Sequence, residues 1–118
     1  MTGAVAAFVA GGAAAFTATI PATLYGSGSG ATSSGSVTTG SASVTVSGGI
    51  APYTYAWSYI SGNSSITITT PTGSSTTFSA TVAGIPKQAN YQCTVTDSLG
   101  HTAVSGTINV TLEWIDTR

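Results

Sequence analysis

The residues that could do chemistry in this chain are few. A nucleophile, a general acid or base, or a metal ligand other than a hydroxyl or phenol would have to come from one histidine, one cysteine and three carboxylates. They are His101, Cys93, Asp97, Glu113 and Asp116. No second histidine or cysteine stands at a metal-ligand spacing, and no dense run of oxygen ligands surrounds the carboxylates. The sequence therefore predicts no enzyme, no cofactor and no metal site.

Each of these side chains has a simpler role than catalysis. The turn-forming run 97–100 precedes His101, so the histidine is predicted to be an exposed turn residue. Cys93 has no partner for an intrachain disulfide and is predicted to be buried and reduced. Asp97, Glu113 and Asp116 are interpreted as solvated surface carboxylates, because calcium needs a denser set of oxygen ligands.

Charge is scarce along the whole chain. The 118 residues include two basic and three acidic side chains, against 22 threonines and 17 serines. Lys87 and Arg118 cannot supply the basic surface that nucleic acid or an anionic membrane requires. A nearly neutral surface with a mean hydropathy of +0.33 has little colloidal protection. It predicts association with other protein, including further copies of this chain.

Residues 1–40 form an uncharged segment of distinct composition. The first 24 residues are rich in alanine and glycine, but they lack a positive n-region and are interrupted by Gly11 and Gly12, so neither a secretory signal nor a membrane span fits. Residues 26–40 are almost entirely Gly, Ser, Thr and Ala, which favours a linker or an extended arm. We predict an assembly arm over 1–40; for the stretch up to Leu24 the alternative is a first strand or short helix of the same domain. The arm's expected contact residues are Val5, Phe8, Val9, Phe16, Ile20 and Leu24.

Residues 41–118 carry the period-2 apolar pattern of β-strands. Alternating apolar positions occur near residues 42–46, 53–59, 66–68, 78–82, 91–95 and 104–112. Gly, Pro, Asn and Asp separate these runs at a spacing of roughly ten residues, without a convincing helical period. The pattern predicts an all-β sandwich.

Two stretches of this region, Gly49–Trp57 and Tyr91–Gly100, resemble the immunoglobulin-like and PKD-like domains of bacterial and bacteriophage surface proteins. The resemblance covers about residues 41–112. It implies that Trp57 fills the core between the sheets and that Tyr91 pins a corner between two strands. Where the antibody-type pattern has its first cysteine this chain has Val46, which implies apolar packing of Val46 against Cys93 instead of a disulfide. The other expected core residues are Phe78 and Val95.

A run of aromatic residues has two interpretations. Tyr53, Tyr55, Trp57 and Tyr59 have the spacing of one strand face, and exposed rings on such a face could stack on sugars. The face bearing a core tryptophan is the buried one, however, with the outer tyrosines reaching the rim. We therefore favour the core interpretation over a glycan contact.

Together these observations predict a non-enzymatic bacteriophage virion structural protein, an accessory capsid subunit of the decoration or head-fibre kind. In this hypothesis the arm docks on the major capsid protein and on neighbouring copies, and the sandwich projects from the virion. The alternatives are a tail component and an adhesion module that binds host-surface glycan.

Overall fold

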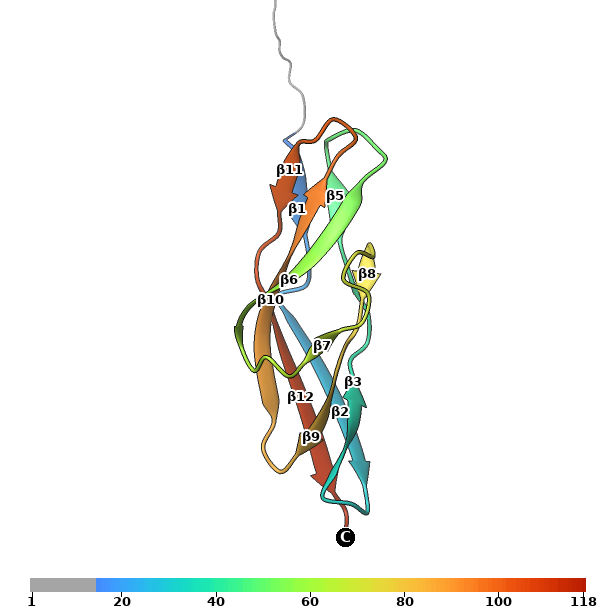
Figure 1. Cartoon of the computed structure of the whole chain (residues 1–118), viewed down its shortest axis with the longest axis vertical. Helices are drawn as coiled ribbons and strands as arrows, with labels where there is room; N and C mark the ends of the chain where they lie inside the picture. Colours follow the sequence, from blue (N-terminus) through green and yellow to red (C-terminus); the bar gives the residue numbers. More distant parts are fainter. Residues whose placement is uncertain (1–14) are drawn as a thin grey trace, which may run out of the picture.

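The computed structural model describes residues 15–118, so Val5, Phe8 and Val9 of the expected arm lie outside the described residues. Residues 15–118 form an elongated sandwich of β-strands with principal extents of 73 × 20 × 19 Å (Figure 1). This part of the chain contains no helix. The all-β class predicted from the sequence is confirmed.

Twelve strands lie within the described residues. They are β1 (Thr17–Thr19), β2 (Thr23–Gly30), β3 (Ser34–Thr38), β4 (Ala42–Ser43), β5 (Thr45–Ser47), β6 (Thr54–Gly62), β7 (Thr67–Ile68), β8 (Ser75–Thr76), β9 (Phe78–Ala83), β10 (Lys87–Thr96), β11 (Thr102–Val104) and β12 (Ile108–Asp116).

The larger sheet is built around β10. Strands β12 and β11 pair antiparallel with β10, β6 also pairs antiparallel with it, and β2 adds to β12 in parallel. The parallel pair stays in register over eight residues of β2, from Thr23 opposite Asn109 to Gly30 opposite Asp116. The remaining strands form a sheet of order β3-β9-β7 and two short pairs, β1–β5 and β4–β8.

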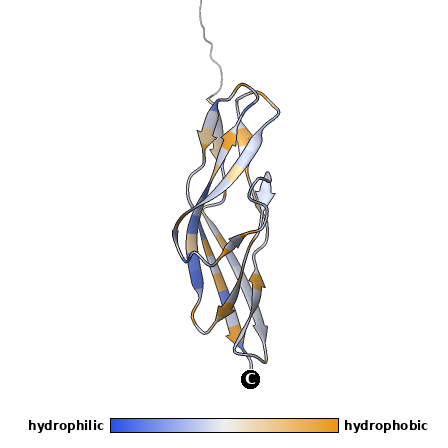
Figure 2. Ribbon diagram, viewed as in Figure 1, coloured by the Kyte–Doolittle hydropathy of each residue, from blue (hydrophilic) through white to orange (hydrophobic). Residues whose placement is uncertain are grey.

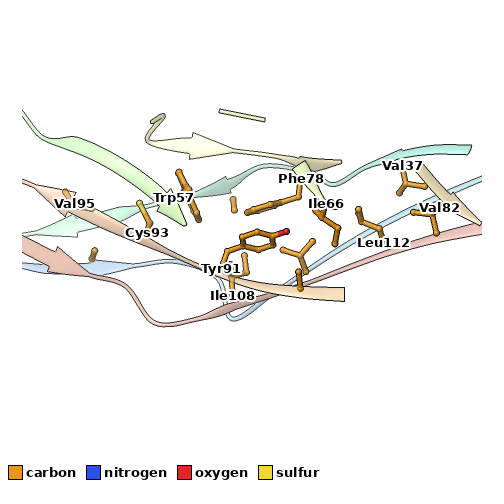
Figure 3. Packing of buried hydrophobic residues seen from close by; sticks show 14 of the residues in the cluster. Val37, Trp57, Ile66, Phe78, Val82, Tyr91, Cys93, Val95, Ile108 and Leu112 are labelled. Atoms are coloured by element: carbon orange, nitrogen blue, oxygen red, sulfur yellow. The ribbon is translucent and has the colours of Figure 1, made fainter. Parts of the chain in front are cut away.

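The core follows from strict alternation along the two longest central strands. Every second residue of β10 from Ala89 to Val95, and of β12 from Ile108 to Leu112, is buried. These side chains meet Phe78 and other apolar residues of the opposite layer (Figure 3). The Phe78 ring lies with its centroid 4.6 Å from that of Tyr91, so aromatic packing joins the two layers.

The two ends of the described chain lie at opposite ends of the sandwich. Residue 15 is beside β1 at one tip, and the chain ends after β12 at the other (Figure 1). Most of the ribbon is pale on a hydropathy scale, and the strongest hydrophilic colour lies on the first half of β10 (Figure 2). The most hydrophilic stretch of the ribbon is therefore the beginning of the central strand of the larger sheet.

The predicted boundary at residue 40 is where the structure differs from the sequence-based expectation. Residues 26–40, expected to be a linker, contain most of β2 and all of β3. Both strands belong to the sandwich, because β2 pairs with β12 and β3 pairs with β9. For the first 24 residues the alternative interpretation, a first strand of the same domain, matches β1 and the beginning of β2, whereas strands over residues 26–38 were not expected.

Candidate interaction surface

The chemistry-bearing side chains are dispersed over the described residues. No group of three or more His, Cys, Asp and Glu residues within 15–118 could hold a metal ion. Lys87 donates a hydrogen bond to Ser65, and Arg118 pairs with Asp116 near the end of the chain. No helix of this part of the chain is long and apolar enough to cross a membrane. The surfaces of the sandwich are therefore the candidates for function.

Asp97 is a buried carboxylate, not the solvated surface group that was expected. Its oxygens accept hydrogen bonds from the backbone N–H groups of Leu99 (3.0 Å), His101 (2.9 Å) and Ile50 (3.3 Å), and one lies 3.2 Å from the His101 ring. Burial alone would raise the pKa of Asp97, but the hydrogen bonds from His101, Leu99 and Ile50 outweigh it and lower the pKa below its ordinary value. The carboxylate thus ties the turn after β10 to the loop before β6.

The tip that carries Asp97 is apolar on its outside. Ile50 and Leu99 expose about half or more of their surface, at 53% and 64%, on the two loops that Asp97 joins. The backbone N–H of Ser98 donates to the C=O of Ile50, which keeps these loops together. This tip is the end of the sandwich at which residue 15 lies (Figure 1).

The expected core residues occupy different depths. Phe78, Cys93 and Val95 are fully buried, and Trp57 is 5% exposed. Burial raises the pKa of the Cys93 thiol. Val46 is only partly buried at the margin of the cluster, on β5 opposite Ala18 of β1.

The corner role that the resemblance implied for Tyr91 is wrong. A tyrosine that pins a corner donates its hydroxyl to backbone, but the buried Tyr91 hydroxyl has no hydrogen-bond partner among residues 15–118. Burial, with a smaller contribution from Tyr59, raises the pKa of Tyr91 to about 12. The ring serves as core filling between Phe78 and Tyr59.

The aromatic run on β6 does not form a flat platform. Trp57 points into the core, donates from Nε1 to the C=O of Gly73 at 2.9 Å, and meets Phe78 edge to face. Tyr53 and Tyr55 are half-buried, whereas Tyr59 is 47% exposed beyond them. Because one ring of the run is core and two more are partly covered, these residues give little support to sugar stacking.

The described arm residues pack on the sandwich itself. Phe16 stacks on Tyr53 with centroids 6.1 Å apart, and Ile20 and Leu24 are partly buried against the core cluster. Leu24 belongs to β2, opposite Val110 of β12. The domain therefore covers part of their apolar surface, and their contact with partner proteins stays a prediction.

Trp114 explains the glycine-rich composition of β2 and β3. Its ring lies over Gly28, Gly30 and Gly35, and a Cβ built on any of them would come within 3.0 Å of a ring atom. Its Nε1 donates to the C=O of Thr32 at 2.9 Å, in the turn between the two strands. The three glycines therefore let the indole ring pack directly against the backbone of β2 and β3, near the C-terminal end of the sandwich.

The outer face of the larger sheet carries a row of hydrogen-bonded amides. Asn90 on β10 donates to Ser61 on β6 at 3.0 Å, and Asn109 on β12 donates to Asn90 at 2.9 Å. Further along the same face, Tyr25 on β2 donates to Glu113 on β12 at 2.7 Å, and this hydrogen bond raises the pKa of Tyr25. These side chains form a polar surface that extends over β6, β10, β12 and β2. The sequence gives no direct signal for it, because the row crosses strands distant in the chain.

Comparisons with known proteins agree with this architecture. A family profile described as the SprB repeat matches residues 32–62. Among solved structures, the PKD domain of human KIAA0319 has a TM-score of 0.54 and 13% identity, covering 87% of this chain and 85% of that domain. The chain has a PKD-like, immunoglobulin-like fold. The M1 domain from titin matches with a TM-score of 0.35 and 13% identity, over 84% of this chain and 95% of that one. This TM-score is too low to indicate a shared fold. No curated protein matches this PKD-like chain in sequence.

Proposed function

We propose that this PKD-like chain is a non-enzymatic structural module that is displayed on a larger assembly and attached through the residues that precede Phe16. The observation that carries the proposal is the position of the chain ends. The sandwich is 73 Å long, the chain enters it at one tip, and it leaves at the other (Figure 1). A module with this geometry separates whatever it displays from whatever holds its N-terminal side.

Surface chemistry supports an attachment that does not depend on charge. Residues 1–14 contain Val5, Phe8 and Val9 and no ionisable side chain, and the tip beside residue 15 exposes Ile50 and Leu99. Apolar contacts of this kind are insensitive to salt, unlike pairs of exposed charges. The match to a repeat family over residues 32–62 also supports a modular unit.

More specifically, we propose that the chain is an accessory capsid subunit of a bacteriophage virion and binds the major capsid protein. It rests on the composition: a nearly uncharged, hydroxyl-rich surface and an uncharged apolar N-terminal segment. A tail component is the closest variant of this idea.

Co-sedimentation with empty capsids tests the proposal. The full chain should bind, Phe8→Asp should weaken binding at least tenfold (about 1.4 kcal/mol), and Thr2→Asp, which adds the same charge at a polar position, should bind normally. Binding should change little between low and high salt. A chain that ignores capsids, or one whose binding is lost steeply as salt rises, would count against this form of attachment.

A second candidate function, adhesion to a host-surface glycan, is favoured by the amide row on the larger sheet. Side-chain amides, a carboxylate and a half-exposed tyrosine are groups that orient sugar hydroxyls and cover a sugar ring. Under this alternative, Asn90→Ala weakens polysaccharide binding in a calorimetric titration, whereas Asn63→Ala, in a turn beyond β6, leaves it unchanged. Equal binding by both variants would show that the amide row does not bind the polysaccharide.

A further inference from the structure

The larger sheet ends in an open edge at β2. The N–H of Asn109 donates to the C=O of Ala22, and the N–H of Thr117 donates to the C=O of Gly30, so the even-numbered residues of this strand direct their backbone groups toward β12. In a parallel pair the intervening residues direct theirs the other way. The backbone N–H and C=O groups of Tyr25, Ser27 and Ser29 therefore face the open edge, and within residues 15–118 no strand pairs with them.

This edge lacks the features that usually prevent strand addition. Natural edges are protected by lysine, proline, bulges or very short strands. Strand β2 is eight residues long, pairs with β12 in continuous register, and contains neither a charge nor a proline. Its Gly and Ser residues leave the backbone accessible to a second strand.

We propose that the N-terminal segment of a second copy of this chain adds to the open edge of β2 as an extra strand, so that copies join head to tail. The inference rests on the proposed function, in that residues 1–14 are the attachment segment, and it names another copy as one of the partners. The donor is residues 4–10, Ala-Val-Ala-Ala-Phe-Val-Ala, which are uncharged and proline-free and include two β-branched residues and an aromatic one.

The positions of the donor and the acceptor favour pairing between copies. Residue 15 lies at one tip, whereas β2 runs from the middle of the sandwich toward the other tip (Figure 1). Fourteen residues reach about 45 Å when fully extended, which is enough to run along β2 of a copy stacked end to end. Neither the donor nor the edge carries charge, so no repulsion opposes the pairing.

Complementation between two defective variants of the full chain tests this proposal. Ser27→Pro removes an N–H that faces the open edge and leaves the hydrogen bonds to β12 intact, so it should block the acceptor only. Phe8→Asp should block the donor only. By sedimentation, each variant alone should associate at least tenfold more weakly than the unmodified chain (about 1.4 kcal/mol), and an equimolar mixture should form a heterodimer. Ser27→Ala is the matched control and should associate like the unmodified chain.

Two outcomes overturn the inference. An unmodified chain that stays monomeric at its solubility limit shows that the edge takes no second copy, or that the segment pairs with its own β2. If Ser27→Pro abolishes association but Phe8→Asp does not, the partner strand is another β2. If Ser27→Pro does not fold by circular dichroism, Ser29→Pro supplies the same block two residues further along. Capsid binding is a separate measurement, so failure here is distinguishable from failure of the proposed function.

Discussion

Adding a single methyl group at Gly35 should destabilise the sandwich strongly. A Cβ at this position would lie 2.6 Å from Cε3 of Trp114 and closer still to two other atoms of the ring. Since the backbone at Gly35 does not have a positive φ, alanine is tolerated there by the chain itself. The loss of stability must therefore come from the indole ring, which has to shift or lose its contacts with the glycines of β2 and β3.

The size of that cost can be estimated from what Trp114 would lose. Trp114 is partly buried, and uncovering about 100 Å² of its apolar surface would cost about 2.5 kcal/mol at about 25 cal/mol per Å². Loss of the hydrogen bond to Thr32 adds about 1 kcal/mol. A partial shift that keeps some contacts costs about 1–3 kcal/mol. We therefore expect Gly35→Ala to lower the free energy of unfolding by about 1–3.5 kcal/mol, and the melting temperature by about 4–8 °C per kcal/mol.

Urea denaturation followed by circular dichroism measures this effect, and a double-mutant cycle identifies its cause. In a Trp114→Ala background the added methyl has no ring to meet, so Gly35→Ala should then change the stability by no more than about 0.5 kcal/mol. Gly40→Ala is the matched control, because a Cβ there meets nothing within 4 Å. The reasoning is refuted if Gly35→Ala is neutral, or if it costs the same with and without the indole.

Three further outcomes are expected. Trp57→Ala should lower the free energy of unfolding by about 3–5 kcal/mol, and a variant that kept its stability in thermal melts but lost affinity for a glycan would contradict the core position. Cys93 should react with a thiol reagent far more slowly in the native protein than in urea, since it is fully buried and its pKa is raised; fast native labelling would show that β10 opens readily. The lowered pKa of Asp97 means that its contribution to stability is complete above its ordinary pKa of 3.8 and is lost as the pH falls through the folded value. Asp97→Asn should accordingly make the stability fall less steeply as the pH is lowered. If the stability falls as steeply as in the unmodified chain, other carboxylates cause the acid sensitivity.

The features that the sequence predicts correctly have local signals. The alternation of Tyr91, Cys93 and Val95 is a period-2 pattern that needs no partner to be recognised, and these residues lie in β10 as a strand with one buried face. The Asp97–Gly100 turn is equally local, because its residues form hydrogen bonds among themselves. Fold class follows from such patterns summed along the chain.

Features that depend on a partner distant in the chain have no such local signal. Gly28 and Gly30 are spaced with period 2, but glycine carries no apolar signal, and the reason for their spacing is an indole more than eighty residues away in the chain. The burial of Asp97 likewise depends on Ile50 of another loop, and the row from Ser61 to Asn109 exists only once three strands are placed side by side. Composition alone made β2 and β3 look like a linker.

The parallel pairing of β2 with β12 determines how this domain would respond to a pulling force. Tension applied between residue 15 and the C-terminus draws β2 toward one tip and β12 toward the other (Figure 1). The force then runs along the two strands, so the hydrogen bonds from Thr23–Asn109 to Gly30–Asp116 are loaded together in shear and are not opened one after another. A domain pulled from both ends would unfold only when the hydrogen bonds of the eight-residue β2–β12 pair break together. The glycine-rich strand β2 would therefore provide the main resistance of the domain to mechanical unfolding.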